Sequence, residues 1–153
     1  TVSSDEKAEV AKSNGADFVF SYEDFEVRAK EVTEGLGVHV VFDGVGAATF
    51  AQDLLALRTR GMLVVIGNAS GPIPAVDINQ LNVNGSLYLT RPTVMHHIGS
   101  SEELKRRASE VFALVESGQI VPQIGGRYPF TEFADAFRAL ESRRTTGKIV
   151  VQH

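Results

Sequence analysis

The sequence predicts an α/β fold built on a doubly wound parallel sheet. Stretches with apolar residues at helical spacing alternate along the chain with short runs rich in β-branched residues. Run 62–67 is continuously apolar, and run 38–46 is β-branched and ends in Asp and glycines. Apolar runs of this kind are typical of strands covered by helices on both faces. The composition, 43% hydrophobic and 22% charged over 153 residues, is that of one ordinary globular domain.

The first element indicates that the chain begins inside a sheet. Thr1-Val2 resembles the last step of a buried strand, and a helix follows at once with Ser4 as its cap. Acidic residues in its first turn suit the helix dipole, and Asn14-Gly15 is a usual helix end.

The middle of the chain continues the strand–helix alternation. Strands are expected at 17–20, 38–46 and 62–67, helices at 23–33 and 47–57, a turn at Arg60-Gly61 and a loop at 68–77.

The remainder predicts two more helices and up to three extended segments. A strand at 85–92 is stopped by Pro92, and a helix at 101–117 has Ser101 as its cap. Segment 120–130 is expected to be extended, 131–143 to be a helix capped by Thr131, and 147–153 to be a strand.

Charge and composition exclude several classes of function. The net charge of −4 provides no general attraction to nucleic acid. The absence of cysteine excludes disulfides, thiol catalysis and cysteine-zinc sites. We expect no metal site, because the adjacent His96 and His97 do not share a face, and no apolar run is long enough for a membrane span. A cytoplasmic location is the expectation.

Ligands of open α/β sheets bind at the carboxyl ends of the strands. Four places of this kind have small or polar residues directly after an apolar run. They are Ser3-Ser4, Asp43-Gly44, Ile66-Gly67-Asn68 and Leu89-Thr90-Arg91. Each alone could be an ordinary turn, but four at corresponding positions favour a binding site.

Three residues indicate which nucleotide such a site would prefer. Ser3 and Ser4 offer hydroxyl groups at a strand end, and Lys7 lies one helical turn further on. A cation at this point of a dinucleotide-binding fold accommodates the 2′-phosphate of NADP, whereas an acid there selects NAD. The alternative is that Lys7 is a solvated helix lysine, and Asp5 would repel a phosphate if it pointed inward.

Two further side chains are candidates for cofactor contacts. Tyr22 follows the expected strand at 17–20 and could lie over an adenine face, or could be a half-buried edge tyrosine. Arg91 precedes a proline at a strand end, where it could bind a phosphate or a cofactor amide, or pair with an acid. No serine elbow, P-loop or carboxylate pair placed for hydrolysis is found.

Several segments together resemble a known family over essentially the whole chain. These are "TVSSDEKAEVAKSNGAD", "VVFDGVG", "GSLYLTRPT", "LVESGQI" and "ESRRTTGKIVV". They are similar to the NADPH:quinone oxidoreductase branch of the medium-chain dehydrogenase/reductase superfamily, which is the zinc-free, zeta-crystallin-like branch. The resemblance implies transfer of hydride or electrons from NADPH to a quinone or a related conjugated carbonyl.

The resemblance also implies roles for residues of this chain, on a Rossmann-like sheet. Ser3, Ser4 and Lys7 would meet the adenosine 2′-phosphate, Tyr22 would lie against the adenine end, and Gly44 would line the adenosine side. The nicotinamide half would be met by Ile66, Gly67, Asn68, Ala69, Leu89, Thr90 and Arg91, with Arg143 or the adjacent Arg144 closing the site. It implies no catalytic side chain that can be placed here.

Family members run to about twice this length, so the resemblance implies that the first strand, glycine-rich turn and first helix are lacking. Residues 1–118 would be a partial NADP-binding domain, and 119–153 would belong partly to a catalytic domain. The chain alone would be inactive. A homodimer through the edge strand near 85–91 is expected, without nucleic acid or membrane partners. The alternatives are an enoyl reductase-type domain or a non-enzymatic nucleotide-binding module.

Overall fold

The computed structural model describes residues 1–142 and 145–153. These residues form two compact units, Thr1–His96 and His97–His153. Each unit combines helices with parallel strands, so the predicted α/β class with parallel sheets is confirmed. The predicted boundary near residue 118 stays a prediction.

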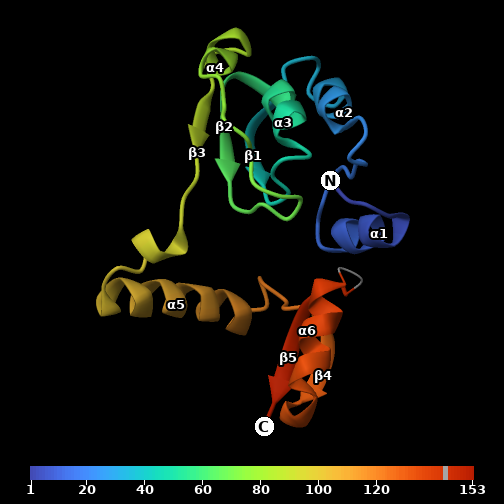
Figure 1. Cartoon of the computed structure of the whole chain (residues 1–153), viewed down its shortest axis with the longest axis vertical. Helices are drawn as coiled ribbons and strands as arrows, with labels where there is room; N and C mark the ends of the chain where they lie inside the picture. The colour runs from blue at the N-terminus through green and yellow to red at the C-terminus, as the bar shows by residue number, and fades with distance from the viewer. Residues whose placement is uncertain (143–144) are drawn as a thin grey trace. The chain divides into compact units, whose positions relative to one another are not determined.

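The first unit is built on a three-stranded parallel sheet in the order β1-β2-β3. The strands are β1 (Val38–Asp43), β2 (Leu57–Val65) and β3 (Tyr88–Thr90). Leu63 at the centre of the sheet lies opposite Val41 on one side and Leu89 on the other. The arrowheads of β2 and β3 point the same way in Figure 1, so the carboxyl ends of neighbouring strands meet at one edge.

Helices cover one face of this sheet. Helix α3 (Phe50–Ala56) lies beside α2 (Phe25–Glu31), as Figure 1 shows, and the short helix α4 (Asn79–Val83) precedes β3. Leu54 of α3 and Leu63 of β2 are only 2% and 0% exposed. The core around them consists of Phe50, Leu54, Leu57, Leu63, Val65 and Leu87.

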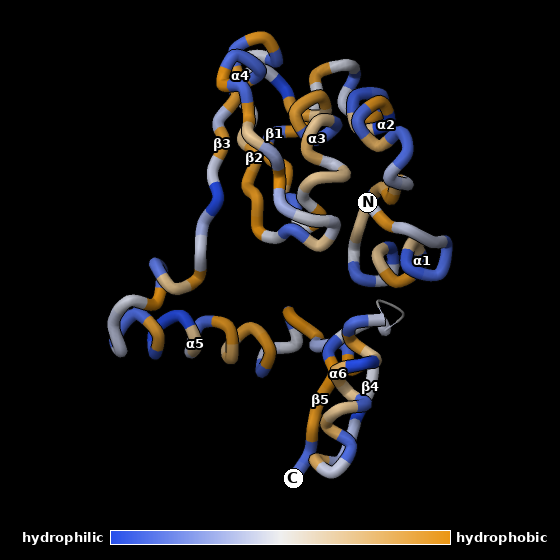
Figure 2. Tube along the Cα trace, in the orientation of Figure 1, coloured by the Kyte–Doolittle hydropathy of each residue, from blue (hydrophilic) through white to orange (hydrophobic). Residues whose placement is uncertain are grey.

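The opposite face of the sheet is open to solvent. Phe42, Val40 and Met62 project from it and are 69%, 41% and 38% exposed. Figure 2 shows the apolar colouring of most of β1 and of the second half of β2. The prediction of strands covered on both faces therefore holds for only one face within this unit.

The chain begins with one rung of parallel pairing. Val2 and Ser21 form an isolated bridge, in which the Val2 N–H donates to the Phe20 carbonyl at 3.0 Å. The predicted strand at 17–20 is therefore reduced to this single bridge. A cavity of about 260 Å³ is lined by Thr1 and Phe20 together with the free-edge strand β1, and no described residue supplies a strand there.

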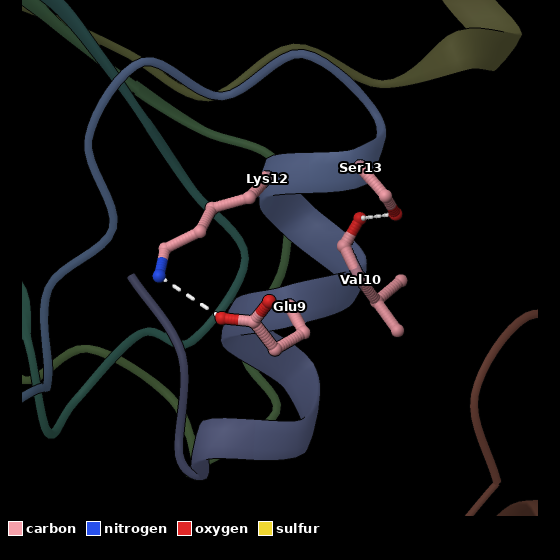
Figure 3. A network of polar contacts seen from close by, with 4 residues as sticks. All are labelled: Glu9, Val10, Lys12 and Ser13. Atoms are coloured by element: carbon pink, nitrogen blue, oxygen red, sulfur yellow. Dashed lines mark hydrogen bonds and ion pairs between the residues drawn. The ribbon is translucent and has the colours of Figure 1, made fainter.

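Helix α1 (Asp5–Ser13) is capped as predicted. The Ser4 hydroxyl accepts from the backbone N–H of Lys7 at 3.4 Å, and Gly15 follows the helix at φ +95°. Figure 3 shows the polar contacts of its last turns, where Lys12 pairs with Glu9 at 3.0 Å and the Ser13 hydroxyl donates to the Val10 carbonyl.

The second unit contains the long helix α5 (Ser101–Glu116), the strands β4 (Ile124–Pro129) and β5 (Lys148–Gln152), and helix α6 (Phe133–Glu141). β4 and β5 form a two-stranded parallel sheet. Helix α6 packs against both strands, and the three elements lie together in Figure 1.

Both helix caps predicted in the second unit are wrong. The cap of α5 is Ser100, not Ser101, because the Ser100 hydroxyl accepts from the backbone N–H of Glu103 at 3.1 Å. Thr131 does not cap α6, because it lies within a 3₁₀ turn, Phe130–Glu132, that leads directly into that helix.

Two local features of the first unit differ from the prediction. Helix α4 lies in a segment for which the sequence predicts no helix. The turn at Arg60-Gly61 lies inside β2 rather than before it, with Arg60 at φ +61°. The backbone N–H of Arg60 donates to the Gly85 carbonyl at 2.7 Å, and this bond to the segment before β3 holds the irregular strand in place.

Candidate functional site

The candidate site is organised around Asp43, the last residue of β1. Its carboxylate is buried, with 3% of the residue exposed. It accepts hydrogen bonds from the backbone N–H groups of Val45 at 2.7 Å and Gly46 at 3.0 Å, and from the Thr49 hydroxyl at 3.1 Å. One side chain therefore fixes the turn after β1, which leads into α3.

The turn after β1 is hydrogen-bonded to the turn that follows β2. The Asp43 carbonyl accepts from the N–H groups of Ile66 at 2.7 Å and Gly67 at 3.1 Å, and the Gly44 carbonyl accepts from that of Ala69 at 3.2 Å. The Ser70 hydroxyl donates to the Val45 carbonyl at 2.7 Å. The predicted residues 66–69 are thus bound to the backbone around Gly44.

Close approach of these two turns depends on glycine. A Cβ on Gly67 would lie 2.7 Å from the Gly44 carbonyl oxygen, and a Cβ on Gly46, at φ +91°, would lie 2.8 Å from that of Gly71. Gly44 itself faces open space, because a Cβ there would meet no atom within 4 Å. The backbone at Gly44 is therefore accessible to a ligand.

The end of β3 completes this edge of the sheet. Thr90 lies opposite Val64 of β2, so Arg91 follows at the level where β2 ends. Leu89, Thr90 and Arg91 are exposed. Three of the four predicted places therefore lie at the carboxyl ends of adjacent parallel strands.

The fourth place, at the N-terminus, has its own cavity. A hollow of about 340 Å³ is lined by Ser3, Ser4 and Tyr22, with Asp5 also on its wall. The Lys7 Nζ donates to the Ser3 hydroxyl at 3.2 Å. Lys7, the predicted cation, thus contacts Ser3, and Asp5 places a negative charge on the wall of the same cavity.

The structure brings the predicted residues together in two groups. Ser3, Ser4, Lys7 and Tyr22 form the first, and Gly44 with 66–69 and 89–91 forms the second. Gly44 of the second group also lines the cavity of about 260 Å³ beside Thr1. Arg143 and its alternative Arg144 lie outside the described residues. The individual roles of all these residues stay predictions.

Sequence reasoning missed one titratable residue near the site, Asp53 of α3. It is only 4% exposed, and burial together with the negative charge of Asp43 raises its pKa from 3.8 to about 7. The two carboxyl groups are ten residues apart, at a spacing that carries no periodic signal. Only the packing of α3 on β1 reveals the pair.

Within the described residues, no group of three or more histidine, cysteine, aspartate or glutamate side chains is placed to hold a metal ion. A search of the same residues finds no helix with the length and apolar character needed to cross a membrane.

Parallel strands whose carboxyl-end turns expose glycine backbone define a nucleotide-binding type of α/β protein. The chain belongs to the zinc-binding dehydrogenase family, whose model matches residues 14–151. This is a family of oxidoreductases, in agreement with the predicted resemblance.

Two curated relatives are similar over almost the whole chain. A quinone oxidoreductase of Pseudomonas aeruginosa is 42% identical over 153 residues, which cover 99% of this chain and 47% of the relative. A 2-haloacrylate reductase of a Burkholderia species is 36% identical, with 99% of this chain and 46% of the relative covered.

Two solved structures share the fold. A mycobacterial protein in complex with NADPH is 46% identical, with a TM-score of 0.92 over 99% of this chain and 48% of its own. The Escherichia coli quinone oxidoreductase in complex with NADPH is 37% identical, with a TM-score of 0.90 over 99% of this chain and 48% of its own. The chain therefore spans about half the length of the relatives it matches.

Proposed function

We propose that this chain is the NADPH-binding part of a quinone reductase. The observation that carries the proposal is the arrangement at the carboxyl ends of the strands, where the turns around Gly44 and 66–69 are bound together and expose backbone. The likeness to quinone oxidoreductases solved with NADPH supports the same cofactor here. NADPH supplies the reducing equivalents, and the residues of this chain bind and orient it.

Each group of residues has a separate task in this proposal. Lys7 and Ser3 bind the 2′-phosphate by charge and hydrogen bonding. Tyr22 lies against the adenine, and Gly44 lets the adenosine half approach the backbone. Residues 66–69 and 89–91 orient the nicotinamide half.

The quinone pocket and the reaction need more than these residues, so we propose that the 153 residues alone do not reduce quinones. The test joins this chain to the half of the P. aeruginosa quinone oxidoreductase that it does not match. We expect the joined protein to oxidise NADPH in the presence of a quinone, with NADH a poorer donor. An inactive but folded joined protein, or turnover by this chain alone, would contradict the proposal.

A conjugated carbonyl is the second candidate substrate class, because the 2-haloacrylate reductase is 36% identical to this chain. The enoyl reductase-type alternative belongs to the same class. Comparing a quinone with an α,β-unsaturated acid as the acceptor, in the full-length natural protein, separates the two. Binding of NADPH without turnover of either acceptor would favour the non-enzymatic alternative.

We also propose a homodimer formed through β3, without zinc and in the cytoplasm. β3 is an edge of its sheet, and its residue Tyr88 is 59% exposed. Two such edges could pair antiparallel across a two-fold axis. Sedimentation of the protein with and without Tyr88→Lys tests the dimer. Metal analysis of the purified protein tests the absence of zinc, and cell fractionation tests the cytoplasmic location.

A further inference from the structure

Asp53 is a buried carboxyl group to which the proposed function assigns no role. It lies on α3, and its backbone N–H donates to the Thr49 carbonyl at 2.9 Å within that helix. Its side-chain atom Oδ2 is buried and has no hydrogen-bond partner in the part of the chain that the structure describes. A buried polar atom left in this way is costly, so the position calls for an explanation.

The group that faces Asp53 from β1 is Asp43, which lines the same cavity of about 260 Å³. α2 also packs against α3, and it meets the cavity beside Asp53 with Phe25 and Ala29. The charged or titratable side chains of these two elements that lie nearest in sequence to the contact are His39, Glu26, Arg28 and Lys30. Among the described residues, the charge that acts on the Asp53 carboxyl group is that of Asp43.

Asp43 uses its side chain as a hydrogen-bond acceptor. Its oxygens accept from two backbone N–H groups and one hydroxyl, and each of these bonds is stronger to a carboxylate than to a neutral acid. A second anion at Asp53 would repel it, whereas a neutral acid at Asp53 can donate a hydrogen bond to it. The pair therefore holds together best with one proton between them.

The hydroxyl of Thr49 connects this pair to the turn. It has one hydrogen to donate, and of its two acceptors the Asp43 Oδ1 atom at 3.1 Å is nearer than the Gly46 carbonyl at 3.4 Å. An ionised Asp53 would compete for that hydrogen, since Thr49 also lies within hydrogen-bonding reach of Asp53. Ionisation of Asp53 would thus repel the Asp43 carboxylate, and it would also draw the Thr49 hydroxyl away from Asp43.

We propose that Asp53 is a positioning residue for the two turns, in that its neutral acid donates to the Asp43 carboxylate and its ionisation loosens the turns that Asp43 holds. Because residues 44–46 and 66–69 carry the proposed cofactor contacts, the proposal rests on the proposed function for its consequence. NADPH affinity should then fall as Asp53 ionises. This loosening of the turns takes place near neutral pH, since the pKa of Asp53 is raised to about 7.

The first test follows the turn itself and needs no cofactor. In the 153-residue chain, NMR spectra recorded from pH 5 to pH 9 report the Asp53 carboxyl carbon and the Val45 and Gly46 amides. We expect the carboxyl carbon and both amides to titrate together near pH 7. A carboxyl carbon that titrates below pH 5, or amides that do not follow it, would overturn the proposal.

Asp53→Asn is the informative variant, because an amide can donate to Asp43 at every pH. We expect it to remove the titration of the two amides while keeping them at their low-pH positions. Asp77→Asn is the matched control: Asp77 is an exposed aspartate whose Oδ1 accepts from the Asn79 N–H at 2.9 Å, and its loss should leave the titration unchanged. Persistence of the amide titration in Asp53→Asn would overturn the proposal.

The second test measures NADPH affinity of the joined protein between pH 6 and pH 8.5. We expect a weakening of about tenfold across this range, absent in Asp53→Asn. A pH-independent affinity in the unsubstituted protein would overturn the link between Asp53 and the cofactor. Absence of NADPH binding at every pH would instead contradict the proposed function, while the amide titration still decides the role of Asp53 at the turns.

Discussion

Gly67 lies so close to Gly44 that a Cβ on Gly67 would be 2.7 Å from the Gly44 carbonyl oxygen. The contact brings the turn after β2 onto the turn after β1, and two backbone hydrogen bonds from Ile66 and Gly67 to the Asp43 carbonyl accompany it. The turns at the ends of β1 and β2 thus form one continuous backbone surface rather than two separate loops.

We expect Gly67→Ala to destabilise the fold by about 1–3 kcal/mol, because the methyl group must displace backbone and not a flexible side chain. Gly44→Ala is the matched control for space, since a Cβ there meets no atom within 4 Å. It should leave stability within about 0.5 kcal/mol but weaken NADPH binding by obstructing the ligand. Urea unfolding and NADPH titration of both variants in the joined protein measure these effects, and equal stability losses would contradict the prediction.

The contact between Lys7 and Ser3 predicts the choice of cofactor. With Nζ 3.2 Å from the serine hydroxyl, Lys7→Ala should raise the Kd for NADPH by about tenfold or more, because a charge-assisted bond to the 2′-phosphate is lost. The Kd for NADH, which lacks this phosphate, should change little.

Lys12→Ala is the control for the loss of a charge on the same helix. Lys12 is also on α1 but pairs with Glu9 at 3.0 Å (Figure 3), and its removal should leave the ratio of the two Kd values unchanged. An equal rise of the two Kd values, for NADPH and for NADH, in Lys7→Ala would show that Lys7 does not bind the 2′-phosphate.

The fold was predictable where local pattern and packing agree. The continuous apolar run around Leu63 correctly indicated a strand of a parallel sheet, and its neighbours in the sheet are Val41 and Leu89. The cap at Ser4 was predictable because its signal lies within one helical turn. The cap of α5 was misplaced by one residue, since Ser100 and Ser101 are adjacent and only the hydrogen bond to Glu103 distinguishes them.

The positions of candidate site residues were predictable where these residues directly follow a strand. The rule that ligands bind at the carboxyl ends of parallel strands correctly grouped Gly44 with residues 66–69. It could not find Asp53, which reaches Asp43 only because α3 packs on β1. The strand expected at 17–20 was overestimated, because the single bridge between Val2 and Ser21 does not make a strand.

The two adjacent serines before α5 give a direct test of the corrected cap. Ser100→Ala should lower the free energy of unfolding by about 1 kcal/mol, because the N–H of Glu103 loses its acceptor. Ser101→Ala should be neutral or slightly stabilising, since Ser101 is the first helical residue and alanine favours helix. Thermal or urea unfolding compares the two, and a larger loss for Ser101→Ala would identify Ser101 as the cap instead.

The raised pKa of Asp53 predicts how stability depends on pH. The folded chain keeps this proton up to about pH 7, whereas the ordinary value of 3.8 applies to the unfolded chain. Between these values the folded state binds more protons, so its stability falls as pH rises from about 4 to 7 and stays reduced above that. At about 1.4 kcal/mol per pH unit, the loss reaches about 4 kcal/mol.

Asp53→Asn should abolish this contribution, because the amide does not ionise. We expect the variant to be more stable than the unsubstituted chain at pH 8 and close to it at pH 4.5, so that the difference between them grows with pH. Urea unfolding at intervals between these pH values measures that difference, and other carboxylates cancel because both chains contain them. Asp77→Asn, which removes an exposed aspartate just before a short helix, is the matched control for an Asp-to-Asn change away from Asp43. A difference for Asp53→Asn that is constant with pH would mean that Asp53 is ionised throughout, and that the fold tolerates two buried anions at the end of β1.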